Sequence, residues 1–219
     1  RYIYMKVEVY IPDTLSEITL GQYQKYLKIQ EDNEDVNFLA MKMIEIFCGL
    51  RGDTILSMKA NSIKDITTIL SDMFNEKPQL VKEFKMGGKT YGFIPKLEDM
   101  SFGEYIDLDT YIGDMSNIHR AMGVLYRPIK QRHKDKYIIE DYKGEQTEVM
   151  KGMPMDAVLS SIIFFYHLGM DLSQAMMSYL QEEEMTLVQQ QILEESGDGI
   201  NHFSASLKEI LEDLRISLN

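Results

Sequence analysis

The sequence predicts a mainly α-helical protein of the α+β class. We expect two related helical units, each preceded by a short strand or hairpin, and a C-terminal helical tail. Two observations support this prediction: one strand-to-helix motif occurs twice, and the segments after each copy carry apolar residues at helical spacing. The predicted units cover residues 1–76 and 77–170, and an acidic helical tail covers 171–219.

The repeated motif is YIPDTLSEITLGQY at residues 10–23 and FIPKLEDMSFGEY at residues 93–105. In both copies a proline ends an extended segment, and a Thr or Ser precedes a Gln or Glu by three residues. That spacing is typical of a capping box, in which two side chains satisfy free N–H groups at the start of a helix. The acidic pattern of Glu104, Asp107 and Asp109 does not recur in the first unit, where the aligned positions hold Gln22, Lys25 and Leu27, so we interpret the motif as a structural joint. The predicted caps are Thr19 with Gln22 and Ser101 with Glu104.

The first unit contains one predicted strand and further predicted helices. KVEVYI at 6–11 alternates in polarity and is followed by proline, which predicts a short strand. VNFLAMKMIEIFC at 36–48 is apolar on most faces and predicts a buried helix that ends at Gly49. Ser62, with Asp65 three residues later, predicts the start of a third helix.

The second unit repeats this order and contains an insertion. Gly87 and Gly88 separate two β-prone segments and predict a hairpin with a two-residue turn. NIHRAMGVLY at 117–126 predicts a buried helix that corresponds to 36–48 of the first unit. The insertion predicts a second hairpin near 131–150, with its turn at Lys143 and Gly144.

Three further helical segments are predicted toward the C-terminus. MPMDAVLSSIIFFYHL at 153–168 predicts a helix that ends at Gly169. The next helix is interrupted at 182–184, and SGDG at 196–199 predicts a flexible break. The last helix carries an apolar stripe that either packs on its own chain or binds a groove of a partner. The stripe consists of Leu207, Ile210, Leu211, Leu214 and Leu218.

Charge is distributed unevenly along the chain. The formal net charge of −12 argues against a broad surface for duplex nucleic acid. Acidic residues are concentrated in 171–219, and a basic segment lies at 127–136. We expect a basic loop that complements the acidic tail, within one chain or between copies, and that makes at most local contact with nucleic acid. Its basic residues are Arg127, Lys130, Arg132, Lys134 and Lys136.

No sequence motif for catalysis, metal binding or a cofactor is present, so we expect a non-enzyme without catalytic or metal residues. His119 is interpreted as part of a basic face with Arg120. An enzyme would need Glu104, Asp107 and Arg120 to meet in one pocket. The single Cys48 fits a reducing compartment. No segment reaches the roughly 18 uninterrupted apolar residues of a membrane helix, so no membrane contact is expected.

At GFIPKLEDMSFGEYIDLD (92–109) and HRAMGVLYRPI (119–129) the sequence resembles uncharacterised structural and assembly proteins of tailed bacteriophages. The resemblance implies a tail assembly chaperone or a minor virion component. Its partners would be other phage structural proteins or copies of itself, and it would reside in the virion or, during assembly, in the host cytoplasm. No functional residue is carried over from this resemblance.

The expected function is therefore non-catalytic binding of proteins. The terminal apolar stripe would supply contact area, and the charged segments would set orientation. Two alternatives belong to other classes of protein. An acidic mimic of nucleic acid would inhibit a host defence protein through its carboxylates, and an enzyme would use Glu104 and Asp107.

Overall fold

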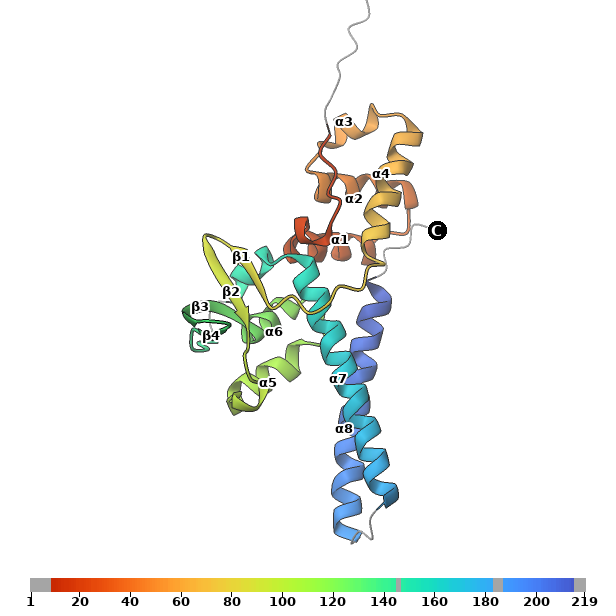
Figure 1. The fold of residues 1–219 in the computed structure, drawn as a ribbon. Coiled ribbons are helices and arrows are strands. Elements are labelled where there is room, and N and C mark those ends of the chain that lie inside the picture. Colours follow the sequence, from red (N-terminus) through yellow and green to blue (C-terminus); the bar gives the residue numbers. More distant parts are fainter. Residues whose placement is uncertain (1–8, 145–146, 183–186, 215–219) are drawn as a thin grey trace, which may run out of the picture.

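The computed structural model describes residues 9–144, 147–182 and 187–214 (Figure 1). This part of the chain is mainly helical with a small antiparallel sheet, which confirms the predicted fold class. The longer helices are α1 (Leu20–Glu31), α2 (Val36–Cys48), α4 (Ala60–Met73), α5 (Phe102–Tyr111), α6 (Ile118–Leu125), α7 (Met155–Glu182) and α8 (Leu187–Asp213). The short helices are α3 (Gly52–Leu56) and the 3-10 turns η1 (Leu15–Glu17), η2 (Leu97–Asp99) and η3 (Glu148–Gly152).

The sheet has the order β1-β2-β3-β4, and all its neighbouring strands are antiparallel. Gly87 and Gly88 have φ angles of +55° and +75°, which confirms the predicted two-residue turn between β1 and β2. Tyr137 of β4 covers Gly92 of β2, where an added Cβ would come within 2.5 Å of the tyrosine ring. The strands are β1 (Glu83–Met86), β2 (Lys89–Phe93), β3 (Tyr126–His133) and β4 (Lys136–Ile139).

The second hairpin lies earlier than predicted, between β3 and β4, and its turn contains Lys134 with a φ angle of 52°. The prediction of a hairpin near 131–150 with a turn at Gly144 is therefore wrong. The basic segment is therefore mostly strand β3, with Lys134 in the turn and Lys136 at the start of β4. Its backbone pairs with β2 and β4, while most of its charged side chains lie on the exposed part of the strand. Charge alone does not exclude a strand, because the ladder uses backbone groups only.

Both predicted capping boxes are present. The N–H of Thr19 donates to Gln22 Oε1 at 2.9 Å, and the N–H of Gln22 donates to the Thr19 hydroxyl at 3.3 Å. The N–H of Ser101 donates to Glu104 Oε2 at 2.7 Å in the same arrangement. A 3-10 turn precedes each cap, so the two copies of the motif form the same local structure.

Two predictions in the first unit are wrong. Residues 9–11 are not in a strand, and residues 6–8 of the predicted strand lie outside the described part of the chain. Helix α4 begins at Ala60, before the predicted cap at Ser62, and its N-cap Lys59 makes no side-chain capping bond. The buried helix α2 and its left-handed end at Gly49 are confirmed.

Helices α7 and α8 run without the glycine breaks that the sequence predicts. Gly169 lies within α7, and an added Cβ there would lie 2.3 Å from the Ser204 hydroxyl of α8. The glycine therefore permits close approach of two helices and does not end one. The segment 196–199 is likewise helical within α8. The predicted interruption at 182–184 falls partly on residues that the structure does not describe.

One hydrophobic core joins all three predicted parts of the chain. The apolar stripe of α8 belongs to it: Leu207, Ile210 and Leu214 are buried, and Leu211 packs against them, while Leu218 lies outside the described residues. These side chains are therefore not free to bind a partner, and the interpretation of this stripe as a partner-binding surface is wrong. The core includes Leu15, Tyr23, Met43, Leu70, Tyr126, Ile162 and Leu207.

Helices α7 and α8 form an antiparallel hairpin that projects beyond the rest of the molecule (Figure 1). We call its projecting part, residues 170–182 and 187–200, the arm. Within the described residues, Met155–Ser178 is long and apolar enough to cross a membrane by length and composition alone, but half of its most apolar window is buried inside the fold. Core helices meet the same criteria, so this stretch is weak evidence for a membrane span.

Candidate functional site

The basic residues of strand β3 find acidic partners close by. Lys130 Nζ lies 2.8 Å from Asp141 Oδ2, and Arg132 Nη1 donates to Glu83 Oε1 at 3.0 Å. Lys134 and Lys136 are exposed at the β3–β4 turn. The described part of the acidic tail supplies none of these partners. Within the described residues, the expected pairing of the basic segment with the tail of the same chain is therefore not formed.

Arg127, the first basic residue of the segment, forms a largely buried ion pair with Glu104. Its Nη1 lies 2.8 Å from Glu104 Oε1, and the two side chains are 12% and 9% exposed. The predicted cap residue Glu104 thus serves two elements, because its other oxygen accepts from Ser101 at the start of α5. Burial alone would raise the pKa of Glu104, but the Ser101 hydrogen bonds and the Arg127 charge outweigh it and lower the pKa.

An open groove of about 1340 Å³ lies beside this ion pair, between strands β3 and β4 and the segment that leads into α5. Tyr142 lines the groove beside Arg127: its ring centre is 6.0 Å from Arg127 Cζ, and its hydroxyl donates to Asp107 Oδ2 at 2.7 Å. The groove lining includes Phe93, Leu97, Glu104, Arg127, Tyr137 and Tyr142.

The three residues of the enzyme alternative are not assembled into one pocket. Glu104 is engaged by Arg127, and Asp107 is engaged by Tyr142. Arg120 packs on the Tyr111 ring at 5.0 Å and donates to its hydroxyl. Neither Asp107 nor Arg120 belongs to the groove lining.

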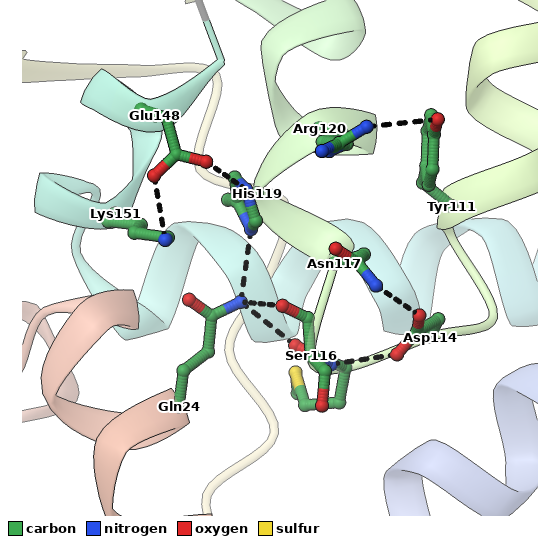
Figure 2. Close-up of polar contacts among 10 residues, drawn as sticks. Gln24, Tyr111, Asp114, Ser116, Asn117, His119, Arg120, Glu148 and Lys151 are labelled. Carbon is green, nitrogen blue, oxygen red and sulfur yellow. Dashed lines mark hydrogen bonds and ion pairs between the residues drawn. The ribbon is translucent and has the colours of Figure 1, made fainter.

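His119 is the centre of a second polar cluster, which joins helices α1 and α6 to η3 (Figure 2). Its Nε2 lies 3.0 Å from Glu148 Oε1, and its Nδ1 lies 3.3 Å from Gln24 Nε2. An amide nitrogen only donates, so Nδ1 is the acceptor and Nε2 carries the proton that is donated to Glu148. The ring is therefore neutral in this arrangement.

The surroundings of His119 support that neutral form. The side chain is only 3% exposed, and burial lowers its pKa, although Glu148 acts in the opposite direction. Gln24 also donates to the carbonyl groups of Met115 and Ser116, and Glu148 pairs with Lys151 at 2.7 Å. The cluster thus ties the first unit to the α5–α6 connection and to η3. The interpretation of His119 as part of an exposed basic face is wrong.

We expect the free energy of unfolding to fall as the pH drops below about 6.5, the ordinary pKa of histidine. The folded pKa of His119 is lowered, so the unfolded chain binds this proton first, and stability rises with pH in that window. One proton contributes at most about 1.4 kcal/mol per pH unit. Urea unfolding between about pH 5 and pH 8 measures this slope.

The control separates His119 from the other titrating groups. His119→Gln should flatten the slope, whereas His167→Gln, at an exposed position on α7, should leave it unchanged. Equal slopes for wild type and His119→Gln would contradict the assignment.

Exposed apolar side chains are the feature that sequence reasoning missed. On α5, Phe102, Tyr105 and Ile106 are spaced as neighbours on one helix face, and all three are exposed. On the arm, Met170 and Met177 lie seven residues apart and are also exposed. Clusters of exposed apolar residues mark surfaces that bind other proteins. The helical spacing was readable in the sequence, but the absence of a covering element was not.

The remaining polar groups give no sign of a metal centre in the described chain, where no group of three or more His, Cys, Asp or Glu side chains is placed to hold an ion. Burial raises the pKa of the Cys48 thiol to about 11, which keeps it protonated.

A smaller cleft of about 330 Å³ lies between α1, the α5–α6 connection and α8, and is rimmed by carboxylates such as Asp114 and Glu209.

The fold and these surfaces define a mainly helical α+β protein with a projecting two-helix arm. Comparison of the chain with protein-family models, with curated proteins and with solved structures found no match.

Proposed function

We propose that the protein is a non-catalytic virion or assembly protein of a tailed bacteriophage, and that it acts through contacts with other phage structural proteins or copies of itself. It would work in the virion or, during assembly, in the host cytoplasm. The resemblance at 92–109 and 119–129 supports the phage setting. The main structural support is the arm, which projects beyond the rest of the molecule (Figure 1) and carries the exposed side chains of Met170 and Met177.

Helices α7 and α8 are joined closely at the base of the arm, and α7 presents exposed methionines on one side. Gly169 allows α7 and α8 to approach closely, and Ser173 donates to Asn201 across the hairpin at 2.9 Å. Met170 and Met177 are 48% and 57% exposed and lie nearly two turns apart on the same side. Methionine adapts to irregular partner surfaces, so this side suits a protein contact.

A pair of charge substitutions tests the arm. Met170→Glu with Met177→Glu should weaken binding to a co-expressed phage structural protein at least tenfold, because each buried methionine side chain contributes about 1.5–3 kcal/mol. Calorimetry with each structural protein encoded beside this chain measures the affinity. The matched control is Ala175→Glu with Ser178→Glu, which adds the same charge on another exposed part of α7.

Circular dichroism should show both double variants to be folded like the wild type, because all four positions are exposed. Equal loss of affinity in both variants, or no association of the wild type with any of these proteins or with itself, would refute the role of the arm. Removal of residues 200–219 cannot replace this test, because it would remove core residues such as Leu207.

A further inference from the structure

The two copies of the repeated joint have the same local structure but opposite exposure. In the first copy, Leu20 and Tyr23 are 0% and 2% exposed. The aligned residues of the second copy, Phe102 and Tyr105, are 78% and 56% exposed. One copy therefore has its apolar face covered, and the other does not.

The junction between η3 and α7 of the same chain covers the first copy. The N–H of Leu20 donates to the Met153 carbonyl at 2.8 Å, and the N–H of Met155 donates to the Ile18 carbonyl at 2.9 Å. These two bonds form an antiparallel bridge between Thr19 and Pro154. The covering segment, residues 151–155 (KGMPM), runs from the end of η3 through Met153 and Pro154 to the first residue of α7, and it pairs with the joint just before α1 begins.

Gly21 explains how closely this segment approaches. An added Cβ at this position would lie 3.0 Å from the Lys151 carbonyl oxygen and 3.2 Å from its Cβ. A larger residue would push the backbone of residues 151–155 away from α1. The glycine of the first copy is therefore required by a covering backbone.

The second copy also has a glycine at the aligned position, but no covering backbone packs against it. An added Cβ at Gly103 would meet nothing within 4 Å. Glycine in a helix costs roughly 1 kcal/mol relative to alanine, so this exposed position is unfavourable in the isolated chain. In the described part of the chain, the Met100 carbonyl and the Phe102 N–H, which match Ile18 and Leu20, also have no hydrogen-bond partner.

We propose that this face of α5, formed by Phe102, Gly103, Tyr105 and Ile106, binds a short apolar segment of another protein chain, which pairs with the joint as the η3–α7 junction pairs with the first copy. The segment pairs with the backbone at Met100 and Phe102 and crosses Gly103, as residues 151–155 cross Gly21. We call these four residues the α5 face.

The contacts between residues 151–155 and the first copy also indicate the chemistry of the occupant. Met153 and Met155 are fully buried against the first copy, so the segment of this chain is already used and the occupant comes from a different chain. Residues 151–155 combine a lysine with unbranched apolar side chains. Exposed Asp109 lies four residues after Tyr105 and three after Ile106 on the same side of α5, so the occupant is a peptide that combines basic and apolar side chains.

The test uses the intact protein and a synthetic peptide, TEVMKGMPMD, which copies residues 147–156 and carries a fluorophore and a photo-crosslinker. Fluorescence anisotropy should show saturable binding, and the crosslinked product should map to α5. Gly103→Leu should weaken binding at least tenfold while the melting temperature stays the same or rises, because Leu favours a helix and the position is open. Leu56→Asp, at an equally exposed apolar residue of α3, is the matched control and should bind normally.

Absence of binding at millimolar peptide, crosslinks to α1, or equal binding by Gly103→Leu would overturn the proposal. A wild-type dimer that Gly103→Leu dissociates would instead identify a second copy as the occupant and overturn the assignment to another chain. The inference rests on the proposed function only in that the partner is a protein. The arm variants should bind the peptide like the wild type, so failure of one proposal leaves the other standing.

Discussion

Replacement of Arg127 by methionine should destabilise the protein by about 3–5 kcal/mol, the typical cost of leaving one member of a buried ion pair without its partner. Glu104 would remain beside Ser101 with only 9% of its side chain exposed and with no opposite charge. Its pKa should then rise relative to the wild type, because burial and the Ser101 hydrogen bonds remain while the lowering effect of the Arg127 charge is lost. Urea unfolding at neutral pH measures the loss.

Two controls show whether the unpaired charge of Glu104 causes the loss of stability. The double variant Arg127→Met with Glu104→Gln should recover most of the loss, because glutamine keeps the capping box, as Gln22 does in the first copy. Lys130→Met breaks the exposed pair with Asp141 and should cost at most about 1 kcal/mol. Equal losses of stability for Arg127→Met and Lys130→Met would show that the buried ion pair stabilises the protein no more than the exposed ion pair does.

Replacement of Leu207 by alanine should cost about 2–5 kcal/mol, because this side chain is fully buried and its removal leaves a cavity. The loss should be the same at every protein concentration, since the contacts are within one chain. If the stripe instead bound a second copy, the free energy of unfolding would depend on concentration. Denaturant unfolding at two protein concentrations that differ a hundredfold distinguishes packing of the stripe within one chain from binding to a second copy.

Lys208→Ala is the matched control for Leu207→Ala. Lys208 is the next residue of α8, is exposed, and faces Glu212 at 3.7 Å. Its replacement should change stability by no more than about 0.5 kcal/mol. A similar loss for both variants would contradict the placement of Leu207 in the core, because alanine favours a helix at least as well as leucine or lysine does.

Features set by neighbouring residues could be predicted from the sequence. The caps at Thr19 and Ser101, the helix end at Gly49 and the turn at Gly87 and Gly88 all follow from side chains within a few positions. The motif repeat was visible because it repeats this local chemistry. Such interactions need no knowledge of the rest of the chain.

Features set by distant residues could not be predicted in the same way. Gly169 looks like a helix end, but its role depends on Ser204 in another helix. His119 stands beside Arg120 in the sequence, yet its environment is set by Gln24 and Glu148. Tertiary contacts overrode local propensity at each of these positions.

The candidate surfaces show the same division. The helical spacing of Phe102, Tyr105 and Ile106 is a sequence property, but their exposure depends on which element packs on α5. The terminal stripe was predicted correctly as a stripe, while its burial depends on the path of α7 and α8. A periodic pattern predicts which residues share a face and does not say what covers it.

The bridge between Thr19 and Pro154 also sets an order for folding on the ribosome. Helices α1 and α2 can pair early, but Ile18 and Leu20 stay uncovered until residues 151–155 have been synthesised. Closing so long a stretch of chain costs entropy before the contact forms, which slows this step. A nascent chain that stalls before residue 155 therefore leaves the apolar residues Ile18 and Leu20 exposed, because the segment that covers them has not yet been synthesised.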